Sequence, residues 1–193
     1  EMPAGWVDFE KRWQHRSRPP GAPIQIPKWK GEQITGKTIL VLGEQGFGDT
    51  IQFLRYTPYL RKLGARVIVQ CREPLHRLVN SIPDVDEVSN IGEKVSADTW
   101  IPIMSLPNIF CTYETTIPLA DGYLPAPPKI INRAERIGLV WAGSPSHGND
   151  LNRSVTLDDL SPILKLDKHA FFSLQMGERR KDCLLYTSDA ADE

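Results

Sequence analysis

The sequence predicts an α/β protein: a Rossmann-like N-terminal domain with a mainly parallel sheet, followed by the truncated start of a second Rossmann-like domain. Strand patterns alternate with helix patterns along the chain, which is typical of parallel sheets. The runs 38–42 and 136–141 are largely aliphatic without polar alternation, as in strands that are covered on both faces. Each run leads into a polar loop that contains glycine, so two βαβ units begin in succession.

Composition and charge are those of an ordinary globular protein. The chain has 193 residues, 40% of them hydrophobic, and a formal net charge of −1, which gives no reason to expect nucleic acid or a membrane surface as a partner. No apolar run approaches the roughly 20 residues of a membrane span, and the first residues lack the layout of a signal peptide. Three widely spaced cysteines argue against a disulfide framework and a zinc site. We therefore expect a cytoplasmic protein without a membrane span.

Two segments precede the first domain. In residues 1–16 the large apolar side chains Trp6, Phe9 and Trp13 stand three and four apart, which predicts an amphipathic helix. Because this helix begins at the first residue with aromatic side chains ready to pack, we expect it to be the end of a preceding helical region. Residues 17–36 are rich in proline and lack periodicity, and we expect them to form an extended linker on the surface of a domain.

The N-terminal domain, residues 37–124, opens on the strand 38–42 and a loop with three glycines, Gly43, Gly46 and Gly48. Glycine suits sharp turns and close approaches of the backbone to a ligand. Asp49 is a good N-cap and Gln52, three positions on, would complete a capping box, so a helix should begin at Thr50. Ligands of such folds bind outside the carboxyl ends of the strands. We therefore expect the functional end of the domain at residues 43–53.

The rest of this domain continues the alternation of helices and strands. The helix should run to Leu63 with Gly64 as its cap, and Pro58 should kink or restart it. Its expected core residues are Ile51, Leu54, Leu60 and Leu63. Further elements are predicted as a strand over 66–71, a short helix from about Pro74, and strands over 85–88 and 99–103.

A second domain follows a proline-rich connector. Residues 125–135 contain three prolines within their first four positions, a usual mark of a domain boundary. Residues 136–182 then hold the strand 136–141, a polar loop over 142–154, a helix over 157–166 and a strand over 170–174. This segment is too short for a complete doubly wound domain.

Several motifs in order resemble one family of bacterial proteins. They are the run 43–56 with Trp29 and Gly31 before it, Ser105-Leu106-Pro107, the run 138–143, Asn149-Asp150, Asn152-Arg153-Ser154 and Ser173-Leu174-Gln175. Together they resemble the glycosyltransferase domain that follows tetratricopeptide repeats in the heptosyltransferase-like superfamily. The resemblance covers roughly residues 1–180, and the segment 5–13 resembles the last helix of the repeats.

This resemblance implies a GT-B fold, in which one Rossmann-like domain binds the acceptor and the next binds the nucleotide sugar. It implies that Asp49 is the catalytic base, and it places the acceptor against Gln45, Gly46, Gly48 and Gln52. The family's Lys-Arg pair is Asn152-Arg153 here, so Arg153 becomes the candidate partner of the donor phosphate. Charge-assisted bonds and hydroxyls of the polar loop would complete that site, from Ser144, His147, Asn149, Arg153 and Ser154.

The implied reaction needs no cofactor, since the nucleotide sugar is a substrate, and no motif here requires a metal. The acceptor would be a glycan, a lipid or a protein, and upstream repeats would offer a surface for a protein partner. Residues 183–193 look like the translation of a sequencing adapter. We therefore expect natural sequence to stop near Asp182, and the fragment itself to be inactive.

Other interpretations stay open. The parent protein could be a scaffold whose transferase-like domain only binds a partner, with Asp49 a plain helix cap and the polar loop merely solvated. A dinucleotide-binding oxidoreductase is the less favoured rival, because the spacing Gly-x-x-Gly-x-Gly reverses the usual fingerprint and no acidic residue ends the second strand. We interpret Cys71 and Cys111 as packed apolar residues. The same holds for the tryptophans at positions 6, 13, 29 and 141.

Overall fold

The structure is a computed structural model that describes residues 2–13, 21–23, 25–120, 122–125, 136–166 and 169–182. Contacts divide the chain into two compact units, residues 1–127 and residues 128–193, here called the first and the second unit. The division falls within the proline-rich stretch 125–135. Both units combine parallel strands with helices, so the predicted α/β class is confirmed.

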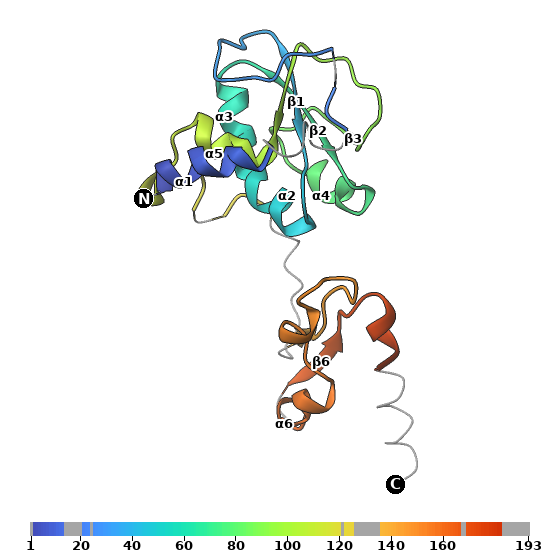
Figure 1. Cartoon of the computed structure of the whole chain (residues 1–193). Helices are drawn as coiled ribbons and strands as arrows, with labels where there is room; N and C mark the ends of the chain where they lie inside the picture. The colour runs from blue at the N-terminus through green and yellow to red at the C-terminus, as the bar shows by residue number, and fades with distance from the viewer. Residues whose placement is uncertain are drawn as a thin grey trace. The chain divides into compact units, whose positions relative to one another are not determined.

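The first unit is built on a four-stranded parallel sheet (Figure 1). Its strands lie in the order β3-β2-β1-β4: β1 is Thr38–Leu42, β2 Arg66–Cys71, β3 Glu87–Asn90 and β4 Thr99–Pro102. The helices are α1 (Met2–Phe9), α2 (Phe47–Phe53), α3 (Thr57–Lys62), α4 (His76–Val79) and α5 (Leu106–Ile109). Short 3₁₀ turns accompany them: η1 (Glu10–Trp13), η2 (Leu54–Tyr56), η3 (Glu73–Leu75), η4 (Ile103–Ser105) and η5 (Glu114–Thr116).

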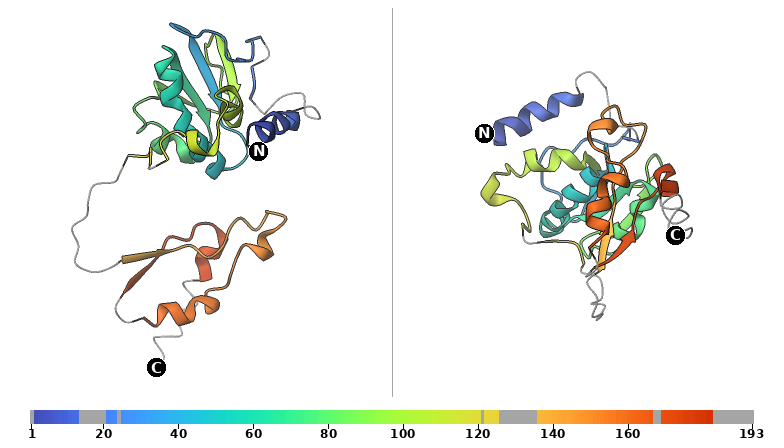
Figure 2. Two further views of the ribbon diagram at one scale, coloured as in Figure 1. Left: turned by 90° about the vertical axis from the view of Figure 1, so that its left-hand side faces the viewer. Right: turned by 90° about the horizontal axis from the view of Figure 1, so that it is seen from below.

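The two faces of this sheet are covered differently. Alternate residues of the strands, such as Val41 and Val69, enter the main core with the helices, among them α3, which lies against the strands in Figure 2. The opposite face, with Leu40 and Ile68, is covered by loop residues near positions 22–26 and 95–97. The strand order explains this, because right-handed crossovers from β1 to β3 place their helices on one face. The connection from β3 to β4 crosses the opposite face of the sheet, and in this protein that connection is a loop.

The helix after the glycines starts earlier than the sequence predicts. Gly46, in an extended conformation, is the N-cap of α2, and Asp49 is its third helical residue. The Asp49 carboxylate accepts the N–H of Gly46 over 2.8 Å. The predictions of Asp49 as N-cap, of a capping box through Gln52 and of a start at Thr50 are therefore wrong. A glycine can cap a helix through its backbone alone, and a carboxylate in the first turn then satisfies a free amide.

The predicted helix 50–63 consists of three pieces, α2, η2 and α3. Pro58 lies in the first turn of α3, which confirms that it restarts the helix. Leu54 and Leu60 are fully buried as predicted, but Leu63 is 43% exposed. Leu63 caps the end of α3 and turns toward solvent, while Gly64 takes the left-handed conformation with φ 80°.

The proline-rich segment is more than a surface linker. Lys28 forms a parallel bridge to Trp100, and the side chains of Trp29 and Ile34 are buried in the main core. The prediction of a superficial linker over 17–36 is therefore wrong for Lys28, Trp29 and Ile34, while residues 17–20 and 24 lie outside the described residues. Burial of Trp29 agrees with its predicted packing role.

The N-terminal helix packs on the first unit. The predicted amphipathic helix is confirmed over residues 2–13, of which the last four form a 3₁₀ turn. Trp6 and Phe9 pack against the main core. The indole of Trp6 donates to the carbonyl of Thr112 over 3.0 Å and meets the ring of Phe53 edge-on at 6.3 Å. This helix is thus a fixed part of the unit.

The second unit contains one pair of described strands. The strands β5 (Arg136–Leu139) and β6 (Ala170–Ser173) pair in parallel. Its helical pieces are η6 (Asp150–Asn152), η7 (Asp158–Leu160), α6 (Ser161–Leu164) and η8 (Glu178–Lys181). The strand predicted over 136–141 ends at Leu139 and alternates between exposed and half-buried residues, so its expected burial on both faces is wrong. Trp141 beyond it is buried.

The two described cysteines differ in burial. Cys71 is fully buried, as predicted, and burial raises the pKa of its thiol to about 11. Cys111 is exposed and has a positive φ of 47°, so its predicted packing is wrong. The reason is its place in the turn that follows α5.

We expect iodoacetamide at about pH 8 to alkylate Cys111 and to spare Cys71. Alkylation needs an accessible thiolate, and Cys71 is both buried and largely protonated at that pH. Mass spectrometry of tryptic peptides would measure the two sites, with alkylation in urea as the control that both peptides are detected. Equal alkylation of both cysteines in the folded protein would contradict this burial.

Candidate functional site

The candidate site of the first unit is the glycine loop, residues 43–48, between β1 and α2. The N–H of Gly43 donates to the carbonyl of Gln70 over 2.7 Å. A Cβ on Gly43 would lie 3.0 Å from that oxygen and 3.0 Å from Oγ1 of Thr50. Glycine suits this close approach between the ends of two strands, because a larger residue would force the neighbouring atoms to shift. Gln45 adopts a positive φ of 59°, which costs a non-glycine residue about 1–2 kcal/mol.

Asp49 follows this loop directly in the sequence. It is half-buried and lies in the first turn of α2, with its carboxylate on the N–H of Gly46. The other predicted acceptor residues, in the glycine loop and in α2, are exposed: Gln45, Gly46, Gly48 and Gln52. All five therefore lie within residues 45–52, just after β1, and Asp49 is bonded to Gly46. A carboxylate in such a position can take a proton from a hydroxyl that binds there.

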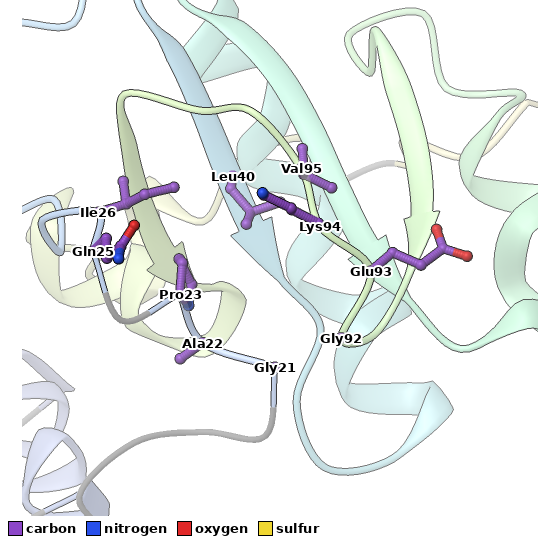
Figure 3. A pocket seen from close by; sticks show the side chains of 10 residues that line it. All are labelled: Gly21, Ala22, Pro23, Gln25, Ile26, Leu40, Gly92, Glu93, Lys94 and Val95. Carbon is purple, nitrogen blue, oxygen red and sulfur yellow. The ribbon is translucent and has the colours of Figure 1, made fainter.

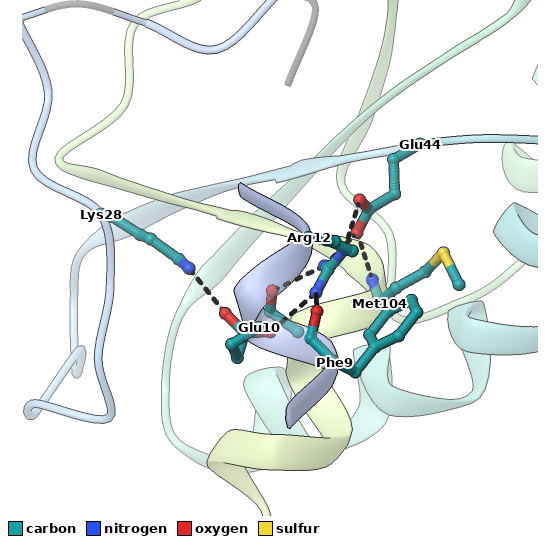
Figure 4. A network of polar contacts seen from close by, with 7 residues as sticks. Phe9, Glu10, Arg12, Lys28, Glu44 and Met104 are labelled. Carbon is teal, nitrogen blue, oxygen red and sulfur yellow. Dashed lines mark hydrogen bonds and ion pairs between the residues drawn. The ribbon is translucent and has the colours of Figure 1, made fainter. Parts of the chain in front are cut away.

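Glu44, inside the same loop, is buried and bound to the N-terminal segment (Figure 4). Its Oε1 accepts from Nη2 of Arg12 over 2.8 Å and from the N–H of Met104 over 3.1 Å, and its Oε2 accepts from Nε of Arg12 over 3.2 Å. No local pattern pairs Arg12 with Glu44, because the two residues are 32 positions apart. The sequence feature that could have indicated this ion pair is Glu44 itself, because a carboxylate just after a buried strand needs a partner.

A second acid joins this network. Nη1 of Arg12 donates to Oε1 of Glu10 over 3.0 Å, and Nζ of Lys28 donates to Oε2 over 2.9 Å. Burial tends to raise the pKa of the Glu10 carboxyl, but hydrogen bonds from Ser105 and Lys28 help to bring that pKa below its usual value. Two cations thus balance two carboxylates around the glycine loop.

The candidate donor residues lie in the second unit, on the polar loop 142–154. Four of them are exposed: Ser144, His147, Asn149 and Arg153. Local bonds shape this surface, since Nδ1 of His147 accepts the N–H of Asn149 over 3.1 Å. Ser154 points inward, where its hydroxyl donates to Asp150 over 2.7 Å and accepts the N–H of Gly143 over 3.0 Å. The loop therefore presents one guanidinium among polar groups.

Gln175 organises the start of the polar loop from inside. Its Oε1 accepts the N–H groups of Trp141 and Ala142 over 3.1 and 3.0 Å. Its Nε2 donates to the carbonyls of Ala142 and Met176 over 3.0 and 2.9 Å. The sequence marks Gln175 only as part of the family resemblance, without a role. A polar residue just after an apolar strand is common, so its position did not indicate these four hydrogen bonds.

A cavity of about 520 Å³ lies on the loop-covered face of the first sheet (Figure 3). Its walls come from Leu40 of β1, from the turn 92–95 and from the segment before β1, namely Gly21, Ala22, Pro23, Gln25 and Ile26. None of the predicted site residues lines it. The cavity and the glycine loop are therefore separate features of the unit.

The sequence does contain one Asp-x-Asp pair, Asp84 and Asp86, which the expectation of no metal overlooks. Oδ2 of Asp86 accepts from Nη1 of Arg61 over 2.8 Å and from the N–H of Val67 over 2.7 Å. This carboxylate thus fixes α3 and β2 to the turn before β3. Within the described part of the chain, no group of three or more acidic, histidine or cysteine side chains could hold a metal ion.

Comparisons with known proteins were made at three levels. Family models, curated proteins and solved structures each gave no match to the chain. Within the described ranges, no helix is long and apolar enough to cross a membrane. What supports a function is therefore the chain's own fold and the geometry of its loops.

Proposed function

We propose that the protein to which this chain belongs is a glycosyltransferase with a GT-B fold. It moves a sugar from a nucleotide sugar to the hydroxyl of an acceptor. The observation that carries the proposal is Asp49, half-buried on the first turn of α2 at the carboxyl edge of a parallel sheet. The family resemblance of the glycine loop agrees with this role. The first unit is then the acceptor domain, and the second unit begins the nucleotide-sugar domain.

The proposed chemistry is one displacement at the anomeric carbon. Asp49 accepts the proton of the acceptor hydroxyl while that oxygen forms its bond to the anomeric carbon. The bond between this carbon and the diphosphate breaks, and the nucleoside diphosphate leaves with the electron pair. Attack from the opposite side inverts the anomeric configuration. The exposed amides of Gln45 and Gln52 hold the acceptor, and the glycines leave it room.

The polar loop supplies the partner of the leaving group. A guanidinium binds phosphate oxygens through charge-assisted bonds, and Arg153 offers one at the surface of the second unit. Ser144, His147 and Asn149 add uncharged polar groups around it. In this proposal the reaction uses neither a cofactor nor a metal ion.

The glycine loop is poorly suited to the rival dinucleotide function. In dinucleotide-binding Rossmann folds, the pyrophosphate binds to the free N–H groups at the start of the first helix. Here the N–H of Gly46 already donates to the Asp49 carboxylate. That carboxylate would also repel a pyrophosphate. The loop geometry therefore favours an uncharged hydroxyl ligand over a dinucleotide.

The full-length protein, expressed from its natural coding sequence, would test the proposal. We expect Asp49→Asn to lower the rate of nucleoside diphosphate release by about 10²–10⁴-fold, because it removes the base and keeps the shape. Arg153→Ala should raise KM for the donor. Chromatography of the released nucleotide, over a panel of nucleotide sugars, measures both. Glu114→Gln, an exposed carboxylate in η5, is the control that should leave turnover unchanged.

Two outcomes would count against the proposal. Full turnover in Asp49→Asn would remove Asp49 as the base. Absence of turnover with any donor in the unaltered protein would instead favour the scaffold, in which the domain binds a partner without catalysis.

A further inference from the structure

The N-terminal segment reaches the edge of the sheet where ligands of doubly wound folds bind. The strand order β3-β2-β1-β4 reverses between β1 and β4, which makes the crevice outside these two strand ends the switch point. Glu44 follows β1, and Met104 and Ser105 follow β4. Arg12 of η1 enters between them and binds both sides (Figure 4). A residue from outside the sheet thus joins the two strand ends.

All the donors of Arg12 are used. A guanidinium carries five N–H groups. Two of them go to the Glu44 carboxylate and one to the hydroxyl of Ser105. The other two go to the carbonyl of Phe9 and to Glu10. The ring of Phe9 lies 4.1 Å from the guanidinium carbon, which fixes the orientation further. Arg12 therefore has a single favourable orientation.

The loop that Arg12 holds is strained. Gln45 sits at φ 59° between two anchored neighbours. On one side Glu44 is bound by Arg12 and by Met104. On the other side the N–H of Gly46 is bound by Asp49. A non-glycine residue keeps such a conformation only when its surroundings impose it. Release of Glu44 removes one of the two anchors and lets the loop relax.

We propose that Arg12 is a positioning residue for Asp49. By holding Glu44 it fixes the glycine loop, and the loop fixes the carboxylate through the N–H of Gly46. This role in catalysis rests on the proposed function, whereas the effect on the loop does not. With this role for Arg12, the N-terminal helix contributes directly to the geometry of the site.

Arg12→Lys tests the inference, because lysine keeps the charge and loses the planar fork. We expect the amide NMR signals of Gln45, Gly46 and Gly48 to shift, and the Gly46 amide to exchange faster with solvent. In the transfer assay of the full-length protein we expect kcat to fall roughly 10- to 100-fold with KM for the donor unchanged. Lys11→Arg, on the exposed side of the same turn, is the matched control and should change neither.

The two readouts separate the inference from the proposed function. Shifted loop signals with a fall in kcat support both. Shifted loop signals in a protein without transfer activity keep the positioning role and remove the transferase. Unchanged loop signals in Arg12→Lys overturn the positioning role whatever the activity. Should this variant fail to fold, Glu44→Gln removes the charge that Arg12 holds and keeps the shape of the side chain, and unchanged loop signals in that variant overturn the positioning role equally.

Discussion

Arg12→Ala is expected to lower the free energy of unfolding of the first unit by about 3–5 kcal/mol. The side chain of Glu44 is 1% exposed and that of Arg12 is 13% exposed, so the substitution leaves a buried carboxylate without its cation. Loss of one partner from a buried ion pair costs far more than loss of a surface pair. A urea titration followed by the indole NMR signals of Trp29 and Trp100, both buried in this unit, would measure the change.

The chain offers a matched control one residue away. Lys11 pairs with Asp8 over 2.6 Å, but their side chains are 60% and 68% exposed. Lys11→Ala should therefore leave the urea midpoint unchanged. The double variant Arg12→Ala with Glu44→Ala should lose less than the sum of the two single losses, because no charge is then left alone. An Arg12→Ala protein as stable as Lys11→Ala would show that the ion pair between Arg12 and Glu44 does not stabilise the first unit.

The strands were predictable because their signal is local. The apolar runs 38–42 and 66–71 read directly as buried strands, and both form parallel neighbours in the sheet. Turn chemistry was partly predictable as well, since Pro58 and Gly64 act where expected. The error of three residues at the start of α2 has a physical cause. A carboxylate serves a helix start equally well as N-cap or in the first turn, so Asp49 alone could not fix the boundary.

The long-range contacts were not predictable from one sequence. The contact between Arg12 and Glu44 depends on the packing of the N-terminal helix against the main core. The burial of Trp29 was predicted, but the bridge between Lys28 and Trp100 beside it was not, because no local pattern indicates that pairing. That Asp49 lies near the rest of residues 45–52 follows from the sequence alone, because they form one short stretch of chain. Candidate residues within a single loop can thus be found from sequence, whereas the groups that hold the loop require the structure.

The second unit has few buried residues and one buried side-chain amide, that of Gln175. Among the residues of this unit that the structure describes, few are buried: Trp141, Ala142, Asp150 and Gln175. Several of its large apolar residues are exposed, among them Leu151 at 94% and Met176 at 77%. Apolar burial therefore contributes little here. Three hydrogen bonds of the Gln175 side chain join the segment after β6 to Trp141 and Ala142, and the fourth goes to the carbonyl of the neighbouring Met176.

Gln175→Ala is expected to unfold the second unit and to leave the first unit intact. The substitution leaves the N–H groups of Trp141 and Ala142 and the carbonyl of Ala142 without a hydrogen-bond partner. Each such group costs about 1–3 kcal/mol when it is buried. The indole NMR signal of Trp141 should move to its unfolded position while that of Trp29 stays. Asn152→Ala, which removes an exposed amide with one bond to Asn149, should change neither signal. A folded Trp141 signal in Gln175→Ala would mean that the polar loop is held by something other than this amide.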